Sequence, residues 1–137
     1  MADLVKYLPP FVTVEKDKPQ IIALCPRERI REAVEYMIKQ NFRFVTMTGY
    51  DDGTNLVVLY HFAFHPGQNV PERGVIHLKV VVSKEDPKIP TVSDILPPAF
   101  LYEREIWEFL GVIFEGHPRL EHLFLTEDYP KYPLRKS

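Results

Sequence analysis

The chain has 137 residues, of which 45% are hydrophobic and 26% charged, and its net charge is -2 at pH 7. That length suits one domain with a buried core, and a near-neutral charge without a basic block argues against nucleic-acid binding. No run reaches the roughly 20 apolar residues of a membrane-spanning helix, and the single cysteine, Cys25, excludes an internal disulfide and a four-cysteine iron–sulfur cluster or thiolate zinc site within this chain.

The first half of the chain begins with a predicted strand and helix. The opening residues MADLVKYLPP lack the pattern of a secretory signal, so we expect a cytoplasmic location. Residues 20–24, QIIAL, are short and branched, which favours a strand. Residues 26–40 then predict a helix that begins at Pro26 and has a solvated polar face. Its apolar stripe recurs at helical spacing and comprises Ile30, Ala33, Val34, Met37 and Ile38.

Three more strands are predicted between residues 43 and 82. Residues 43–48 and 54–65 are joined by Asp51-Asp52-Gly53, whose chemistry suits a hairpin turn. The second of these strands is apolar on both faces and is therefore expected to be a central strand of the sheet, covered on both sides. Residues 75–82 alternate between apolar and polar side chains, as a half-buried strand does.

The second half of the chain is predicted to cross over the sheet and form one more helix. Residues 85–98 contain four prolines and indicate an extended segment. A helix over 99–110 should end at Gly111, and its inner stripe comprises Tyr102, Ile106, Phe109 and Leu110. Residues 112–137 have no long period, and apolar side chains in such a tail commonly mark a protein interface. These are Phe114, Leu120, Leu123, Phe124, Leu125, Tyr129, Tyr132 and Leu134.

Together the elements predict an α/β protein of the α+β type. We expect a small mixed, largely antiparallel sheet of about four strands, two main helices and an extended C-terminal tail. Residues 1–111 are expected to form the compact part and residues 112–137 a partner-binding tail, within a single domain overall.

The charged residues of the second helix admit three interpretations. The residues that lie mostly off the apolar stripe are Glu103, Arg104, Glu105 and Glu108. They form either a solvated face, a surface for another protein, or an acid/base site. A hydrolase would require two carboxyl groups some 5 to 10 Å apart across a cleft, with the pKa of one raised by burial. The sequence offers no such cleft.

Other sites are not supported by the sequence. His61 and His65 fall in a strand and would lie roughly 13 Å apart, too far to share one metal ion. His77, His117 and His122 are scattered along the chain. No glycine-rich phosphate loop or nucleophile motif is present. We therefore predict no catalytic, cofactor-binding or metal-binding residues in this chain.

Two stretches of the C-terminal half resemble a known family. They are YEREIWEFLGVIFEGHP and, following it, LFLTEDYPKYPLRK. The similarity is to the 30 kDa-type subunit of respiratory complex I, a family that includes the C-type and J-type subunits of NADH dehydrogenase. The same family occurs in energy-converting membrane-bound hydrogenases. Upstream, LVVLYHFAFH resembles the family's central strand. The signature and interface positions are Glu103, Arg104, Glu105, Glu108, Gly111, Gly116, His117, Pro118, Pro133, Leu134, Arg135 and Lys136.

The resemblance implies an accessory subunit rather than a free-standing enzyme. Such a subunit has no redox cofactor and braces a large subunit of the 49 kDa or hydrogenase large-chain type, next to iron–sulfur subunits. The clusters, and the quinone or NiFe site, belong to those partners. The chain is then expected on the cytoplasmic side of the membrane, attached only through the complex. The alternatives are the equivalent subunit of a NiFe hydrogenase and, more remotely, a hydrolase using Glu103 and Glu105.

Overall fold

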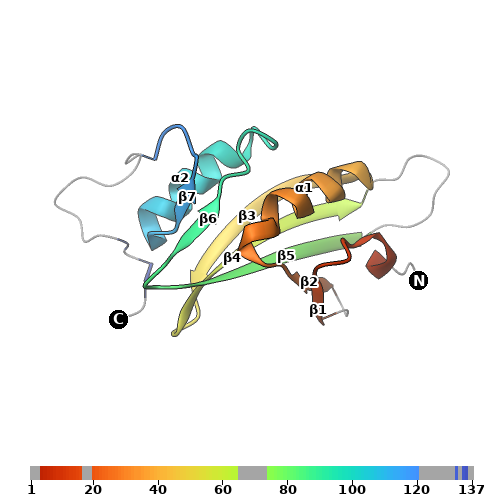
Figure 1. Ribbon diagram of the computed structural model, residues 1–137, viewed down its shortest axis with the longest axis horizontal. Helices are drawn as coiled ribbons and strands as arrows, with labels where there is room; N and C mark the ends of the chain where they lie inside the picture. The colour runs from red at the N-terminus through yellow and green to blue at the C-terminus, as the bar shows by residue number, and fades with distance from the viewer. Residues whose placement is uncertain (1–3, 17–19, 65–73, 121–131, 133, 136–137) are drawn as a thin grey trace.

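The computed structural model describes residues 4–16, 20–64, 74–120, 132 and 134–135 (Figure 1). Short 3-10 turns occupy Leu4–Tyr7 and Arg27–Arg29. The strands and helices, in chain order, are β1 (Thr13–Lys16), β2 (Ile21–Leu24), α1 (Ile30–Lys39), β3 (Phe42–Asp51), β4 (Asn55–Phe64), β5 (Gly74–Ser83), β6 (Lys88–Pro90), α2 (Ala99–Leu110) and β7 (Ile113–Glu115).

The main sheet has five strands in the order β1-β2-β5-β4-β3. All neighbouring pairs are antiparallel except β2 and β5, which run parallel. The β3–β4 hairpin turns at Asp51-Asp52-Gly53, where Asp52 Oδ1 accepts hydrogen bonds from the backbone N–H groups of Thr54 and Asn55. Gly53 has a φ of 101°, a conformation that glycine adopts without a steric penalty. The turn and the interior position of β4, between β5 and β3, confirm the sequence predictions, whereas the expected cover on both faces of β4 is wrong because the helices lie on one face only.

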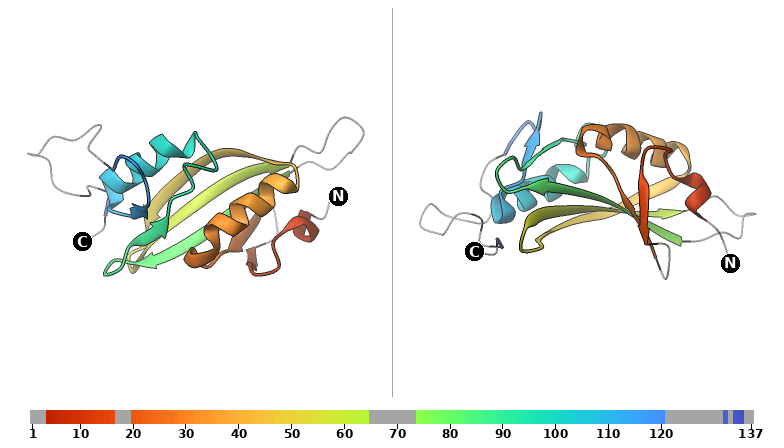
Figure 2. Two further views of the ribbon diagram at one scale, coloured as in Figure 1. Left: turned by 45° about the horizontal axis from the view of Figure 1, so that its top comes forward. Right: turned by 60° about the horizontal axis from the view of Figure 1, so that its bottom comes forward.

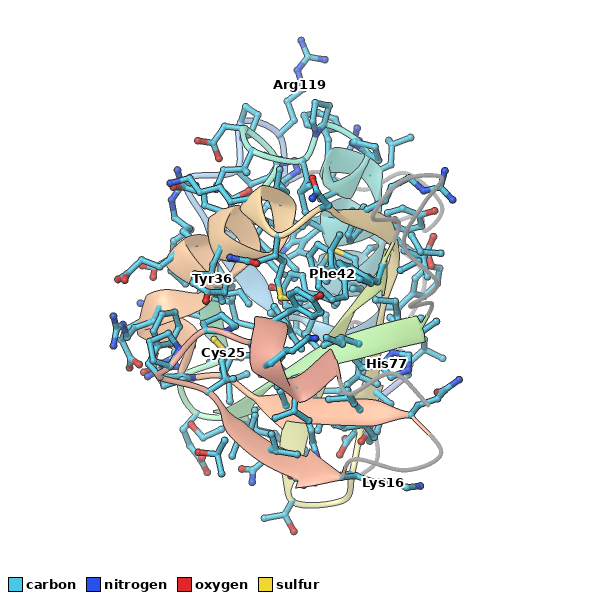
Figure 3. All side chains as sticks on the ribbon, turned by 90° about the vertical axis from the view of Figure 1, so that its right-hand side faces the viewer. Lys16, Cys25, Tyr36, Phe42, His77 and Arg119 are labelled. Carbon is cyan, nitrogen blue, oxygen red and sulfur yellow. The ribbon has the colours of Figure 1, made fainter. Side chains whose placement is uncertain are left out.

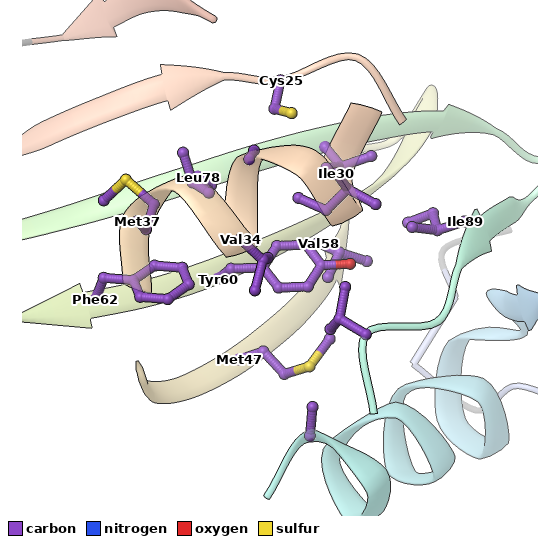
Figure 4. Close-up of a cluster of buried hydrophobic side chains, with 14 of the residues drawn as sticks. Cys25, Ile30, Val34, Met37, Met47, Val58, Tyr60, Phe62, Leu78 and Ile89 are labelled. Carbon is purple, nitrogen blue, oxygen red and sulfur yellow. The ribbon is translucent and has the colours of Figure 1, made fainter. Parts of the chain in front are cut away.

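Both helices lie on the same face of the main sheet (Figures 1 and 2). The core fills the space beneath α1, where Val34 and Met37 meet Tyr60, Phe62 and other side chains of the central strands (Figure 4). Because every second residue of β4 and β5 points toward the helices, the remaining residues form an open face on the other side. That open face carries the half-buried His61 and His77.

A second, two-stranded parallel sheet joins the crossing segment to the chain that follows α2. In it, β6 pairs with β7, with Ile89 opposite Phe114. Both side chains are almost completely buried. This small sheet lies beside α2 at one end of the molecule (Figure 2). α2 therefore packs between β3 of the main sheet and the β6–β7 layer.

The fold class is confirmed: the structure is of the α+β type, with two helices and a mostly antiparallel main sheet. Some details differ from the prediction. α1 begins at Ile30 rather than at Pro26, because residues 27–29 form a 3-10 turn. Ile38 is 40% exposed and thus lies outside the buried stripe. β1, β6 and β7 were not expected, and Phe114 is a core residue rather than an exposed residue of the tail.

Candidate functional site

The charged side chains of α2 are largely buried, which argues against the interpretation as a solvated face. Glu103 and Glu108 are 0% exposed and Arg104 is 7% exposed. Of the residues of this helix, Leu101 and Glu105 are the exposed ones. These residues lie off the apolar stripe and are nevertheless buried because α2 is covered on two sides, by β3 and by the crossing segment, so that one apolar stripe does not describe its environment.

Glu103 joins α2 to the crossing segment. Its carboxylate accepts hydrogen bonds from the hydroxyl of Thr91 and from the backbone N–H of Val92, the latter at 2.9 Å. Burial raises the pKa of Glu103 to about 7, and the two hydrogen bonds act in the opposite direction but do not cancel it. The residue is therefore a buried acid that changes its charge near neutral pH, at a point where two segments of the chain meet.

His117 lies on the other side of this junction, with its side chain fully buried. Its Nδ1 accepts a hydrogen bond from the backbone N–H of Arg119 at 2.9 Å, so its proton is on Nε2, which donates to the carbonyl of Phe100 at 2.9 Å. Nε2 is 4.0 Å from Oε1 of Glu103. Gly116, with a φ of 86°, turns the chain so that this ring reaches α2. His117 thus anchors the turn to the first part of the helix.

The last described residues close the opposite end of α2. Gly111 has a φ of 82° and ends the helix, as the sequence predicted. The backbone N–H of Leu134 donates to the carbonyl of Phe109 at 2.9 Å, and Nε of Arg135 donates to the carbonyl of Leu110 at 2.6 Å. These bonds satisfy carbonyl groups that a helix end leaves without intrahelical partners. The guanidinium of Arg135 also lies over the ring of Tyr132.

The structure thus brings most of the signature residues together around α2. Glu103, Arg104 and Glu108 lie inside the molecule, whereas Glu105, Gly116 and Pro118 are exposed. Leu134 and Arg135 meet the end of the helix. The two remaining signature positions, Pro133 and Lys136, lie outside the described residues. The described signature residues therefore lie in and around α2, at one end of the protein.

A surface pocket next to this junction is lined by residues of α1, the crossing segment and the turn after β7. Arg31 crosses its rim, donating to both carboxylate oxygens of Asp94 at 2.7 and 2.8 Å and to the carbonyl of Thr91 at 2.7 Å. The hydrogen bonds from Arg31 lower the pKa of Asp94 to about 2. Arg31 of α1 and Glu103 of α2 therefore both form hydrogen bonds with the crossing segment.

The geometry does not support a pair of catalytic carboxylates. Glu103 is buried and Glu105 is exposed, because residues two apart on a helix point about 160° away from each other. Among the described residues there is no group of three or more histidine, cysteine or acidic side chains that could hold a metal ion. His65 and His122 lie outside those residues, so the expected separation of His61 and His65 stays a prediction. Neither described helix has the length and apolar character needed to cross a membrane.

The sequence reasoning missed one cluster, on the open face of the main sheet. His61 lies directly opposite His77 on the neighbouring strand, and their Nδ1 atoms are 2.5 Å apart. The two residues are separated by sixteen positions in the chain, so only the register of β4 with β5 reveals their contact. A prediction of strand pairing would have been the necessary signal.

Comparison with known proteins identifies relatives of the whole described fold. A family model described as "Respiratory-chain NADH dehydrogenase, 30 Kd subunit" matches residues 23–137. NADH-quinone oxidoreductase subunit 5 of Thermus thermophilus is 34% identical over 120 residues, covering 82% of this chain and 58% of that protein. The C-type NADH-quinone oxidoreductase subunit of Chloroherpeton thalassium is 37% identical over 132 residues, covering 95% of this chain and 50% of that protein. The chain thus spans between half and three fifths of these two relatives.

Two solved structures share the fold. A trypsin-resistant fragment of Nqo5 aligns with a TM-score of 0.66 and 28% identity, covering 80% of this chain and 89% of the fragment. A chain of the membrane-bound sulfane sulfur reductase, described as an archaeal respiratory membrane complex, aligns with a TM-score of 0.76 and 27% identity. The second alignment covers 96% of this chain and 78% of the other.

Proposed function

Since the chain belongs to the family of the respiratory-chain NADH dehydrogenase 30 kDa subunit, we propose that it is an accessory subunit of a complex I-related membrane-bound oxidoreductase. In this proposal it braces the large subunit of the hydrophilic arm while neighbouring iron–sulfur subunits transfer electrons. The observation that carries the proposal is the family match over residues 23–137, which includes the whole signature around α2.

The proposed role requires no redox cofactor in this chain. Its single cysteine, Cys25, is buried, and burial raises the pKa of its thiol to about 12. Such a thiol is a poor metal ligand because thiolates, not thiols, bind metals. The clusters of an electron-transfer path, and the quinone or NiFe site, would then belong to the partner subunits. Attachment to the cytoplasmic side of the membrane would follow from the complex as a whole.

We propose that the partner binds the end of the molecule formed by α2, β7 and residues 132, 134 and 135. This end, the signature end, exposes three large apolar side chains, with Leu101 and Leu134 each 58% exposed and Ile113 36% exposed. Glu105 lies one helical turn from Leu101 on the same side of α2. Apolar side chains beside a charge suit an interface in which apolar contacts supply affinity and the charge supplies register. The buried Glu103, Arg104 and Glu108 support this surface from within.

A second candidate is the same role in a complex with a different electron donor and acceptor. The alignment with a chain of the sulfane sulfur reductase complex, over 96% of this chain, favours it. The equivalent subunit of a membrane-bound NiFe hydrogenase belongs to the same class of alternative. All these complexes would use a bracing subunit of one fold, so the partner and not this chain distinguishes them.

The proposal is tested by isolating the complex from native membranes. The tagged chain is purified after detergent solubilisation, and the chains that accompany it are identified by mass spectrometry and analysed for bound metals. Recovery of a large subunit and iron–sulfur subunits is expected. A large subunit that retains nickel would identify a hydrogenase, and one without nickel a quinone-reducing or sulfur-reducing complex. Absence of any stoichiometric partner would contradict the proposal.

Matched variants test the surface itself. Leu101→Asp on α2 should reduce recovery of the large subunit, whereas Ile38→Asp, at the similarly exposed apolar position of α1, should not. Glu105→Lys and Glu35→Lys form a second pair of exposed charge reversals on the two helices. Arg104 is unsuitable for this purpose because it is buried, so that its replacement would also change the stability of the domain. Equal recovery from both members of each pair would place the interface elsewhere.

A further inference from the structure

The open face of the main sheet brings two imidazoles together at its centre. His61 of β4 and His77 of β5 are register partners, and their rings meet nearly edge to face, with centroids 4.6 Å apart. The two Nδ1 atoms converge at 2.5 Å. Figure 3 shows His77 on the side of β5 away from α1. Since both residues belong to the central strands, the convergence is built into the register of the sheet.

Outer hydrogen bonds hold both rings in place. His77 Nε2 lies 2.8 Å from Oε1 of Gln20, and because that oxygen accepts, Nε2 of His77 carries its proton. Nδ1 of His77 then has a free lone pair and accepts from Nδ1–H of His61. Nε2 of His61 accepts in turn from the hydroxyl of Thr48 at 2.9 Å. A single proton therefore lies between the two Nδ1 atoms, within a chain of hydrogen bonds that spans four segments.

We propose that His61 and His77 form a two-histidine site for a divalent transition-metal ion, which both Nδ1 atoms bind in place of the proton they share. The metal ion takes the position of the shared proton, but that proton stays on the histidine pair. The proton on Nδ1 of His61 moves to Nε2 of the same ring, and the hydroxyl of Thr48 rotates from donor to acceptor. Both rings then donate an Nε2–H to an outer oxygen atom, the arrangement that commonly orients metal-binding histidines.

The geometry favours ions with right-angled coordination. With metal–nitrogen bonds near 2.0 Å, two ligands at 90° are about 2.8 Å apart, whereas tetrahedral ligands are about 3.3 Å apart. The Nδ1 separation of 2.5 Å is closer to the value for Cu²⁺ or Ni²⁺ than to that for Zn²⁺, and both rings must also turn so that their lone pairs meet at an ion beside the line that joins the two atoms. The order of intrinsic affinities also places Cu²⁺ first. Water would complete the coordination, since both rings are only half-buried.

The surroundings leave both rings partly accessible from the open face. Burial lowers the pKa of both rings, and the neighbouring His77 lowers that of His61 further. Charged side chains on this face include Lys79, which is paired with Glu15 at 2.8 Å, and the exposed Arg43 of β3. Both positive groups disfavour a bound cation, so we expect a labile site rather than a permanent one. The inference does not depend on the proposed function.

Copper titration of the full 137-residue chain tests the site. Isothermal titration calorimetry at pH 7.5 should show one saturable site, and the electron paramagnetic resonance spectrum of that species should show two equatorial nitrogen ligands. His61→Gln and His77→Gln should each weaken binding at least about tenfold, with circular dichroism showing the fold retained. The variant with both His65→Gln and His122→Gln, which removes two other imidazoles, should bind as the original chain does.

The change of tautomer provides an independent measurement. In ¹⁵N spectra of the ring nitrogens, His61 should change from the Nδ1–H to the Nε2–H form when Zn²⁺ is added in excess. Thr48→Val removes the outer acceptor of His61 and should weaken Cu²⁺ binding by about tenfold, the lower end of the effect of outer hydrogen bonds. An affinity in the His61 or His77 variant equal to that of the original chain, a spectrum with fewer than two nitrogen ligands, or an unchanged tautomer would each overturn the proposal.

Discussion

The backbone N–H of Val92 donates a hydrogen bond of 2.9 Å to Oε2 of Glu103, a side chain with no exposed surface. Through this bond and that of Thr91, a carboxyl group on α2 holds the crossing segment that leads into it. His117 and the Arg31–Asp94 pair complete the surroundings of the carboxyl group. The charge of one buried acid is therefore linked to the packing of the whole signature end.

The first prediction concerns the stability of the domain as a function of pH. The pKa of Glu103 is about 7 in the folded chain, against 4.5 for an unperturbed glutamate. A raised pKa means that the folded state binds the proton more tightly, so its stabilisation is complete below pH 4.5 and lost as the pH rises through 7. The loss amounts to roughly 3 kcal/mol. Glu103→Gln removes this ionisation and should flatten the profile from about pH 4.5 to about pH 8.

Urea unfolding of the two proteins at several pH values measures this effect. The free energy of unfolding of Glu103→Gln minus that of the original chain should increase by a few kcal/mol from about pH 4.5 to about pH 8, because only the original chain loses stability over this range. Glu105→Gln is the control for removal of one charge from the exposed side of the same helix. A constant difference between Glu103→Gln and the original chain across this range would show that the buried carboxyl group does not titrate there.

The second prediction concerns Gly111, whose backbone and surroundings both exclude a side chain. Its φ is 82°, and a Cβ would lie 2.8 Å from the guanidinium of Arg135 and 2.9 Å from the ring of Tyr132. Gly111→Ala should therefore destabilise the domain by about 1–3 kcal/mol through backbone strain, and more if Tyr132 and Arg135 are displaced. Gly53→Ala is a matched control, since φ there is 101° but no atom lies within 4 Å.

Thermal unfolding of both glycine variants separates the two contributions. The lower midpoint of Gly111→Ala relative to Gly53→Ala reports the contact with the C-terminal residues. Should both variants lose the same stability, the contact of Tyr132 and Arg135 with Gly111 would contribute nothing in solution.

The third prediction concerns Arg135, whose Nε donates to the carbonyl of Leu110 at 2.6 Å. A cation that donates to the last carbonyl groups of a helix stabilises it by about 0.5–2 kcal/mol. Arg135→Met keeps the length of the side chain but removes both effects, and Arg119→Met, on the exposed turn after β7, is the control. Hydrogen exchange at the amide of Leu134, which donates to Phe109, should accelerate only in the Arg135 variant.

This measurement also addresses the predicted division at residue 111, which stays a prediction. The sequence predicted that residues 112–137 form a partner-binding tail, yet the last described residues of this tail contact α2 of the same chain. Unchanged exchange at Leu134 in the Arg135 variant would indicate that the C-terminal residues are held by other contacts.

The sequence identified features that depend on local chemistry. The turn at Asp51-Asp52-Gly53 and the helix end at Gly111 were predicted because a positive φ selects glycine at defined places. The buried state of Glu103 was not predicted, since helical periodicity describes one covered side and α2 has two. The contact of His61 with His77 was missed for a related reason: it depends on which strands pair, and pairing is decided by the packing of the complete sheet.

The fourth prediction concerns Gly49, which shows where α2 meets the main sheet. A Cβ at this position of β3 would lie 2.8 Å from Cδ1 of Leu110 and 3.2 Å from Cγ2 of Ile106. Since both side chains are buried, they have little room to move, and Gly49→Ala should cost about 1–3 kcal/mol. Leu110→Val removes the atom that is too close, so the cost of Gly49→Ala should fall when the two changes are combined. A double-mutant cycle by urea unfolding measures this coupling. Strictly additive effects would mean that α2 lies further from β3 than the structure shows, and the support that it gives to the signature end would have to come from the β6–β7 layer alone.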